Sequence, residues 1–365
     1  MSSDEQLIVL FLPGLTAGGA ERVVTSMASV WCDQKRRVQI LLLEGTTEHF
    51  FNFEKPIPVT SLDAYRGTSI LDRISFLRNI LALRRALRAL RPNTVASFLT
   101  GPNVLSILAA VGLPVRTVVS ERNNIQKRPL PIFWSCLRRI TYRFSDLVTY
   151  NFKGNEPILE IYVPRRKLRY LPNPIKTPNI EISSKQRRNT ILSIGRLAFQ
   201  KGYDILIPAF ANSHSPERGW NLVIVGNGEE KASLVNKIKE YDMEGVITIL
   251  DPNPEIWSEY LDCQYFILPS RFEGMPNALL EAIGYELTPL VSDMVGDLVT
   301  PIQQLDPKLV HTAANEPSIV DQLNWATDPL RSDQILSSSD CQKLLAPHDL
   351  KKSLPEWNSI FFPQH

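Results

Sequence analysis

Residues 190–202 of this 365-residue chain read TILSIGRLAFQKG, a strand-like run that leads into a glycine-bounded loop with two cations. The first five residues are apolar or β-branched apart from one serine, as in a strand buried on both faces of a parallel sheet. The loop from Gly195 to Gly202 holds Arg196 and Lys201 between its two glycines. Glycines let a backbone approach an anion closely, and the helix that follows presents free N–H groups. The pattern predicts a diphosphate-binding turn, and a basic surface loop is the alternative.

A second glycine turn follows the next strand-like run, residues 221–225. It consists of Gly226, Asn227 and Gly228, and a helical pattern begins directly after it. A turn of this kind can bring backbone N–H groups close to a nucleotide. We expect it to approach the base or ribose if it lies beside the first loop, and a purely structural turn is an equal alternative.

Two carboxylates stand eight positions apart in residues 269–281, which read PSRFEGMPNALLE. Glu273 belongs to a glycine-containing turn, whereas Pro276 stands where first-turn prolines of helices occur. Glu281 then falls about one turn inside the helix. We therefore expect Glu281 near the helix mouth, where it can accept hydrogen bonds from a ribose, and Glu273 where it can meet a sugar ring.

The same rhythm of short apolar runs and helical patterns fills the chain, which is typical of βαβ units on parallel sheets. The predicted strands are 7–12, 38–43, 94–98, 116–119, 147–150, 190–194, 221–225, 246–250, 265–268 and 290–292. The predicted helices are 20–31, 74–90, 104–115, 132–144, 203–211, 229–241 and 277–285. The fold class is α/β, and the length suits two domains, joined by the proline-rich stretch 171–178 and the polar stretch 183–189.

The composition is that of an ordinary globular protein, with 44% hydrophobic and 21% charged residues. The four cysteines are far apart and form no C-x-x-C pair, which predicts neither a zinc site nor a disulfide framework. The first residues lack the basic and apolar regions of a secretory signal. We therefore expect a cytoplasmic protein.

The charge is unevenly distributed. Residues 1–175 carry 24 Lys and Arg against 13 Asp and Glu, and residues 176–365 carry 16 against 25. The basic residues cluster at positions 84–91, 127–143 and 165–169. This asymmetry predicts that the first half faces an anionic partner, such as a phospholipid surface, and an evenly solvated surface is the alternative.

These motifs together resemble one family, the retaining GT-B glycosyltransferases of family 4 or group 1 type, which includes enzymes of bacterial polysaccharide and lipopolysaccharide biosynthesis. The resemblance spans nearly the whole chain. Its marks are residues 18–22 (GGAER), Gly195-Arg196 with Lys201-Gly202, residues 226–228 and the E-x7-E pair. It implies two Rossmann-like domains that face each other across a cleft. These are an acceptor-side domain of residues 1–172 and a nucleotide-sugar domain of residues 173–345, with a terminal helix in 346–365 that crosses back.

The resemblance also implies roles for the marked residues. Arg196 and Lys201, after Gly195, hold the donor diphosphate, and Glu281 binds the ribose. Glu273, with the backbone of Gly274, Met275, Pro276 and Asn277, contacts the donor sugar. Gly18 and Gly19 approach the phosphates from the other domain. Transfer with retention from a UDP- or GDP-sugar is implied, without a covalent intermediate.

No D-x-D motif occurs, so the sequence predicts that Arg196 and Lys201 replace a bridging metal and that no metal or further cofactor is used. Two stretches depart from the family pattern. Residues 120–124 (SERNN) lack the acceptor-side histidine of many relatives, so Glu121 or Arg122 is a candidate for acceptor binding, with a buried structural ion pair as the equal alternative. Residues 293–297 (DMVGD) replace the usual glycine-rich stretch.

The basic first half and the aromatic, basic stretch 132–144 suggest a lipid-linked glycan acceptor and peripheral attachment to the cytoplasmic face of the inner membrane. The alternatives are an ordinary core helix at 132–144, a nucleotide-sugar epimerase of the same architecture, and a non-catalytic membrane-surface scaffold. Nucleic-acid binding is disfavoured because no recognised motif accompanies the basic residues.

Overall fold

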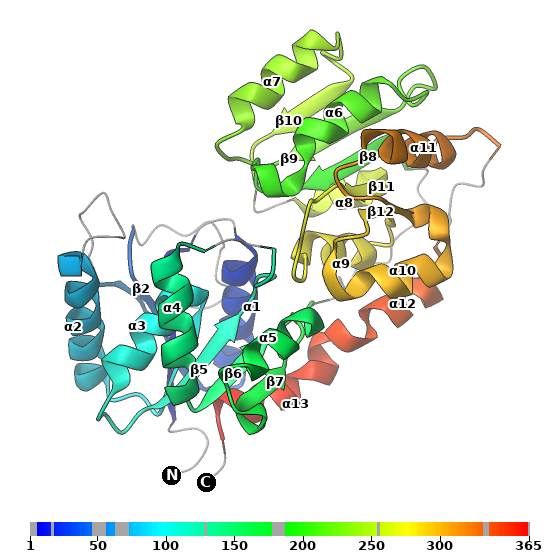
Figure 1. Cartoon of the computed structure of the whole chain (residues 1–365). Coiled ribbons are helices and arrows are strands. Elements are labelled where there is room, and N and C mark those ends of the chain that lie inside the picture. The colour runs from blue at the N-terminus through cyan, green and yellow to red at the C-terminus, as the bar shows by residue number, and fades with distance from the viewer. Residues whose placement is uncertain are drawn as a thin grey trace. The chain divides into compact units, whose positions relative to one another are not determined.

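The computed structural model describes residues 6–15, 18–45, 56–62, 73–127, 130–176, 187–253, 256–330 and 336–363. The chain divides into two compact units, of which the first comprises residues 1–173 and 353–365 and the second residues 174–352. Each unit is an α/β layer structure around one parallel sheet, as the sequence predicted (Figure 1).

The first unit contains a seven-stranded sheet. Its strands are β1 (Leu7–Leu12), β2 (Arg37–Leu42), β3 (Val59–Ser61), β4 (Thr94–Phe98), β5 (Arg116–Glu121), β6 (Leu147–Tyr150) and β7 (Leu168–Tyr170). They pair in parallel in the order β3-β2-β1-β4-β5-β6-β7. The order reverses between β1 and β4, the switch point at which such sheets bind ligands.

Helices cover this sheet. They are α1 (Gly19–Asp33), α2 (Arg73–Leu90), α3 (Thr100–Ala110), α4 (Ile132–Thr141), α5 (Glu156–Glu160) and, after the second unit, α13 (Leu350–Phe361). Helix α3 contacts β1, β4 and β5 and is flanked by α2 and α4 (Figure 1). Helix α13 packs against α1, because the Trp31 ring meets the rings of Trp357 and Phe361 at centroid distances of 6.4 and 5.4 Å.

The second unit contains a six-stranded sheet. Its strands are β8 (Arg188–Ile194), β9 (Asn221–Val225), β10 (Ile247–Leu250), β11 (Cys263–Leu268), β12 (Thr288–Ser292) and β13 (Val310–His311). They pair in parallel in the order β10-β9-β8-β11-β12-β13, which reverses between β8 and β11. The unit has its own apolar core, which includes buried side chains of β8, β9, β11 and β12.

The helices of the second unit are α6 (Tyr203–Ala211), α7 (Lys231–Glu240), α8 (Trp257–Asp262), α9 (Asn277–Gly284), α10 (Val299–Leu305), α11 (Glu316–Ala326) and α12 (Ser338–Leu345). Helix α6 packs between α7 and α11, and α9 contacts α12 (Figure 1). Helices therefore follow the strands along the chain, as in a Rossmann-like domain.

The predicted bounds of β1, β4, β6, β9 and α6 match the structure, and most others agree within two residues. The helix predicted at 104–115 lies about four residues earlier in the structure, since α3 begins at Thr100 and ends at Ala110. Gly112 takes φ +71° and closes the turn after it. The predicted helix 132–144 changes at Tyr142 from α-helix to a 3-10 turn, η2 (Tyr142–Phe144). Residues 177–186 of the predicted linker lie outside the described residues.

Among the described residues, no helix has both the length and the hydropathy that a membrane span requires.

Candidate functional site

Three of the predicted loops leave neighbouring strands of the second sheet. Residues 195–202 follow β8, residues 226–230 follow β9, and residues 269–276 follow β11. The strands lie in the order β9-β8-β11, and all three loops leave carboxyl ends. The sheet order reverses between β8 and β11, so the first and third loops flank the switch point. The topology thus gathers three separate sequence motifs at one place.

Lys201 and Glu273 meet across this switch point. The Lys201 Nζ lies 2.6 Å from the Glu273 Oε1, and their side chains are only 16% and 10% exposed. The Lys201 side chain reaches this position by passing over Gly195, where an added Cβ would come within 2.8 Å of the Lys201 Cε. Glycine at position 195 therefore leaves the room that the lysine needs.

Further hydrogen bonds fix the Glu273 carboxylate. The Ser270 hydroxyl donates to its Oε1 at 3.0 Å, and the Gln200 side-chain amide donates to its Oε2 at 3.3 Å. The backbone N–H of Glu273 donates to the carbonyl of Met294 at 2.8 Å. Because these bonds come from three segments, the carboxylate is held in one orientation.

Arg196 differs from Lys201 in its surroundings. Its side chain is exposed, and it forms no hydrogen bond or ion pair with any residue that the structure describes. The loop therefore presents one cation that is fixed by a carboxylate and one that is exposed to solvent. Such an arrangement suits an anion that binds the fixed cation, Lys201, and is also contacted by Arg196 from the solvent side.

The glycines of the second loop allow close packing on the first. An added Cβ at Gly226 would overlap the carbonyl oxygen of Gly195, and one at Gly228 would overlap that of Leu197. The N–H of Leu197 donates to the Asn227 carbonyl at 3.0 Å. Loop packing thus explains both glycines, and nucleotide contact by residues 226–228 stays a prediction.

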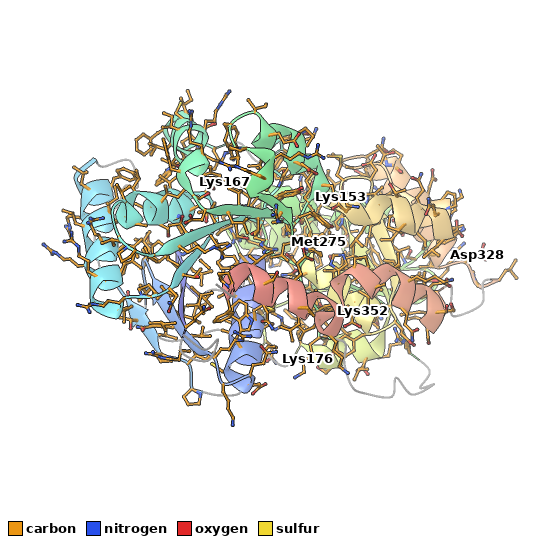
Figure 2. The ribbon with its side chains drawn as sticks, turned by 90° about the horizontal axis from the view of Figure 1, so that it is seen from below. Lys153, Lys167, Lys176, Met275, Asp328 and Lys352 are labelled. Carbon is orange, nitrogen blue, oxygen red and sulfur yellow. The ribbon has the colours of Figure 1, made fainter. Side chains whose placement is uncertain are left out.

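Glu281 is the fifth residue of α9, and Tyr260 of α8 orients its carboxylate. The Tyr260 hydroxyl donates to the Glu281 Oε2 at 3.1 Å, and the Tyr260 ring stacks on that of Tyr285 at 5.1 Å. Residues 274–276, which precede α9, are buried, and Asn277 begins the helix. Met275, labelled in Figure 2, belongs to the core of the second unit.

Sequence reasoning missed four side chains that support these residues: Gln200, Ser270, Arg271 and Tyr260. Three of them lie inside the quoted motifs, within three positions of Lys201 or Glu273. Their proximity to Lys201 and Glu273 in the sequence was a usable signal. No local pattern links Tyr260 to Glu281, because the two residues belong to different helices.

Gly18 and Gly19 belong to the first unit, at the start of α1. Gly18 is the N-cap residue, and an added Cβ there would overlap the Glu21 carboxylate, which folds back over the helix start. The helix begins after β1, next to the switch point of the first sheet. Contact of either glycine with donor phosphates stays a prediction.

Glu121 ends β5 and is 1% exposed. Its Oε1 accepts hydrogen bonds from the Thr100 hydroxyl, at 2.9 Å, and from the Tyr142 hydroxyl. Burial and the neighbouring carboxylate raise the pKa of Tyr142, which therefore stays a hydrogen-bond donor. Glu121 thus connects β5 with α3 and η2.

Arg122 is 7% exposed and binds the end of the first unit. Its Nη1 donates to the Leu171 carbonyl and to the Asn173 Oδ1, each at 2.9 Å. Its guanidinium lies 5.1 Å from the Trp357 ring centroid of α13. Burial lowers the pKa of Arg122 to about 9, so the group remains charged at neutral pH. Acceptor contact by Glu121 or Arg122 stays a prediction, since both side chains are enclosed by these partners.

Two family models match consecutive parts of this chain. The glycosyl transferase 4-like domain matches residues 18–174, and glycosyl transferases group 1 matches residues 176–329. The first match begins at the Gly18-Gly19 motif, and the second contains all three loops of the second unit.

Named relatives and solved structures are similar to most of the chain. The chain is 28% identical over 282 residues, 77% of each protein, to a GalNAc-alpha-(1->4)-GalNAc-alpha-(1->3)-diNAcBac-PP-undecaprenol alpha-1,4-N-acetyl-D-galactosaminyltransferase of Campylobacter jejuni. It is also 28% identical, over 316 residues (79% of this chain and 81% of the relative), to the N-acetylgalactosamine-N,N'-diacetylbacillosaminyl-diphospho-undecaprenol 4-alpha-N-acetylgalactosaminyltransferase of that organism. The crystal structure of Anabaena Alr3699/HepE with UDP and glucose superposes with a TM-score of 0.77 at 15% identity, over 96% of this chain and 98% of HepE.

Proposed function

This chain belongs to the group 1 glycosyltransferases of the GT-B fold, and on that premise we propose that it moves a hexose from a UDP- or GDP-sugar to a lipid-linked glycan, with retention of configuration. A nucleotide-sugar donor and a glycan acceptor are general to the family. The two Campylobacter relatives are named for acceptors linked to undecaprenol through a diphosphate, which supports a lipid-linked acceptor for this chain.

The observation that carries the donor proposal is the Lys201–Glu273 ion pair at the switch point of the second sheet. When the bond between sugar and phosphate breaks, negative charge develops on the departing nucleoside diphosphate. Cations that are already in place stabilise this charge without reorganisation. Lys201 meets that requirement because Glu273 fixes it, and Arg196 adds a second positive charge from the exposed side of the same loop.

The remaining site residues then have separate tasks. Glu281, oriented by the Tyr260 hydroxyl, accepts hydrogen bonds from the donor ribose. Glu273 and the backbone of residues 274–277 face the donor sugar. We assign no nucleophile, since attack on the same face without a covalent enzyme intermediate accounts for retention. The two cations take the place of a bridging metal.

A thermal-shift screen tests the donor proposal. UDP-, GDP- and ADP-sugars, each with and without EDTA, are added to the purified chain. Sugars of one nucleotide base are expected to raise the melting temperature, by more at higher donor concentration, and EDTA is expected to leave the shift unchanged. A chain that none of the three donor classes stabilises would contradict the donor proposal, and a shift abolished by EDTA would contradict metal independence.

We further propose that the first unit attaches to the cytoplasmic face of an anionic membrane. Helix α4 and η2 carry an exposed apolar stripe at a spacing of four residues, and it is composed of Ile132, Cys136, Ile140 and Phe144. The exposed side chains of Arg139 and Arg143 border this stripe. An apolar face bordered by basic residues is the pattern of a helix that lies in a membrane interface.

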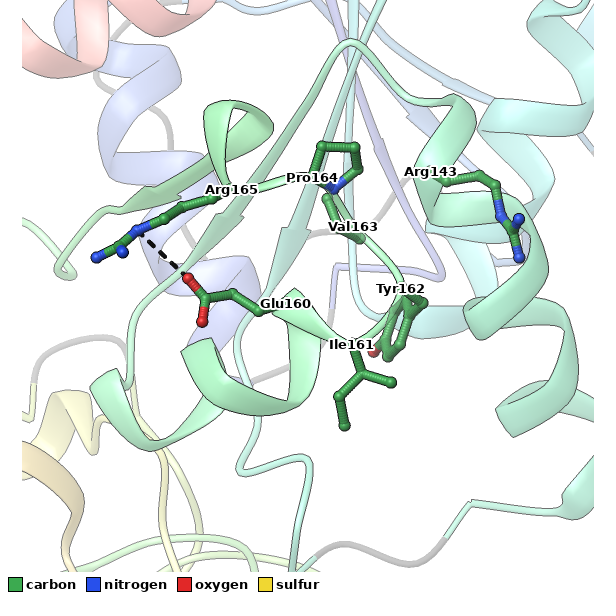
Figure 3. A pocket seen from close by; sticks show the side chains of 7 residues that line it. All are labelled: Arg143, Glu160, Ile161, Tyr162, Val163, Pro164 and Arg165. Carbon is green, nitrogen blue, oxygen red and sulfur yellow. Dashed lines mark ion pairs between the residues drawn. The ribbon is translucent and has the colours of Figure 1, made fainter.

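A pocket of about 590 Å³ adjoins the end of this stripe (Figure 3). Arg143 and Arg165 lie on opposite sides of it, and Ile161 and Val163 stand between them (Figure 3). Arg165 also pairs with Glu160 at 3.3 Å. Nearby, Lys167, labelled in Figure 2, donates to the Arg143 carbonyl at 2.9 Å. The pocket thus combines apolar walls with cations, which supports contact with an anionic headgroup.

Vesicle sedimentation tests the membrane proposal. Each basic residue near an anionic surface contributes about 1 kcal/mol, so the variant Arg139→Ser/Arg143→Ser is expected to bind vesicles with 30% anionic lipid about 30-fold more weakly than the wild type. The control Lys237→Ser/Lys239→Ser removes two charges from α7 and is expected to bind like the wild type. Equal binding of the wild type to neutral and anionic vesicles would contradict attachment.

A further inference from the structure

Arg271 belongs to the third loop of the second unit, and its side chain reaches the first loop and the start of α6. Its Nη1 and Nη2 donate to the two carboxylate oxygens of Asp204, each at 2.7 Å. The Nη1 also donates to the Phe199 carbonyl at 2.6 Å. Such a two-pronged bond between guanidinium and carboxylate fixes direction as well as distance.

The Phe199 ring covers this ion pair. The Arg271 guanidinium lies 3.9 Å from the ring centroid, although the ring itself is mostly exposed. The side chains of Arg271 and Asp204 are 14% and 33% exposed. Because partial burial strengthens such an ion pair and the ring adds a cation–π contact, this contact is stronger than an ordinary surface pair.

The backbone around Arg271 joins the same two loops. The Arg271 N–H donates to the Gln200 carbonyl at 2.8 Å, and the Gln200 side chain donates to the Phe272 carbonyl at 3.0 Å. The residues bound in this way, Phe199, Gln200 and Asp204, stand on both sides of Lys201 in the sequence. On the other loop, Arg271 stands two residues before Glu273. The network therefore holds the chain on both sides of Lys201 and the segment that leads into Glu273.

A second carboxylate lies close to this network. Glu230 follows the glycine turn of the second loop, and its N–H donates to the Leu197 carbonyl at 3.0 Å. Burial and the charge of Asp204 raise the pKa of Glu230, whereas Arg271 lowers it. Arg271 thus offsets the repulsion between the carboxylate of Asp204, in the first turn of α6, and that of Glu230, at the end of the second loop.

We infer that Arg271 is a positioning residue, which aligns Lys201 with Glu273 by binding Phe199, Gln200 and Asp204 without itself contacting the donor. The inference rests on the proposed function for its effect on turnover. Its structural part, that Arg271 joins the first loop to the third, stands on the contacts alone. Lysine cannot replace it, because an ammonium group can neither bind a carboxylate in two-pronged fashion nor stack flat on a ring.

The kinetic test uses Arg271→Ala. A misplacement of about 1 Å in a catalytic group costs up to about 100-fold in rate, so we expect kcat to fall about 30-fold, while the donor KM changes less than about 5-fold because Glu281 is untouched. Arg271→Lys is expected to recover only a small part of this loss. Asp204→Asn is expected to lower kcat in the same direction, and the double variant Arg271→Ala/Asp204→Asn to be no worse than Arg271→Ala.

A matched control is Arg188→Ala. Arg188 pairs with Asp262 at 2.8 Å, but it stands at the opposite end of β8 from the loops, and its side chain is 62% exposed. This variant removes an arginine–aspartate pair from the same unit and is expected to keep the wild-type kcat. The comparison shows whether the loss of kcat is specific to the Arg271–Asp204 pair or follows from the loss of any arginine–aspartate pair in this unit.

Hydrogen–deuterium exchange gives a readout that does not depend on turnover. In Arg271→Ala, amide exchange in residues 198–204 and 270–274 is expected to rise about 10-fold, with no change in Arg188→Ala. Unchanged exchange together with a kcat equal to that of the control would overturn the inference. A wild-type chain that accepts no nucleotide sugar would instead overturn the proposed function, and the exchange measurement would still decide whether Arg271 joins the loops.

Discussion

Lys201→Ala is expected to lower turnover about 100- to 1,000-fold while the chain remains folded. The substitution removes the cation that Glu273 holds at 2.6 Å and that the donor proposal places at the diphosphate. Its loss leaves Arg196 as the remaining cation of the loop, and Arg196 is exposed, so water screens its charge. The measurement is kcat with the donor that the thermal-shift screen identifies.

Two further variants separate the catalytic effect of this change from its effect on stability. Lys201→Ala leaves the buried Glu273 carboxylate without its cation, which is destabilising. The double variant Lys201→Ala/Glu273→Gln removes the leftover charge, so we expect it to regain thermal stability but not turnover. Lys343→Ala breaks a surface pair with Asp340, 3.5 Å long, and is expected to behave like the wild type. Turnover of Lys201→Ala within about 3-fold of this control would refute the phosphate role.

Gly202→Ala is expected to have the largest effect on stability among the site glycines. Gly202 takes φ +74°, which costs an alanine about 1–2 kcal/mol, and an added Cβ would overlap the carbonyl oxygen of Pro269. A backbone oxygen cannot move aside as the end of a side chain can. We expect a loss of at least about 3 kcal/mol in the free energy of unfolding, or a displaced loop with a similar loss of turnover.

Gly219 offers a matched control, because it has the same φ of +74° and no atom within 4 Å of an added Cβ. Gly219→Ala is expected to cost only the backbone term, about 1–2 kcal/mol. Urea unfolding followed by tryptophan fluorescence, to which the buried Trp220 of the second unit contributes, measures both variants. If the two substitutions cost the same, the close approach of Gly202 to Pro269 is not the reason for glycine at position 202.

Local sequence patterns predicted the parallel α/β class, ten of the 13 strands and seven of the 13 α-helices that the structure describes. Buried parallel strands read as short apolar runs, and the helices between them carry their own periodicity. Short elements such as β3, β7 and β13 were missed, since two or three residues are too few to show a period. The bounds of α3 were displaced for another reason, because an apolar helix that follows a buried strand shows no clear boundary in the sequence.

The motifs also indicated which loops to examine, because glycine, basic and acidic residues after a strand have direct chemical meaning. They did not show how the loops meet. Lys201 and Glu273 stand 72 positions apart, Arg271 and Asp204 stand 67 apart, and only the pairing of β8 with β11 brings each pair together.

Likewise, only the tertiary structure of the first unit shows the surroundings of Glu121 and Arg122. The sequence left open whether they bind an acceptor or form a buried structural ion pair. In the folded unit both side chains are buried, and residues of α3, η2 and α13 lie against them. Local sequence therefore specified the elements and the chemistry of the side chains, because both depend on neighbours along the chain. The partners and the burial of those side chains depended on the order of the strands, since sheet pairing joins residues that no local pattern connects.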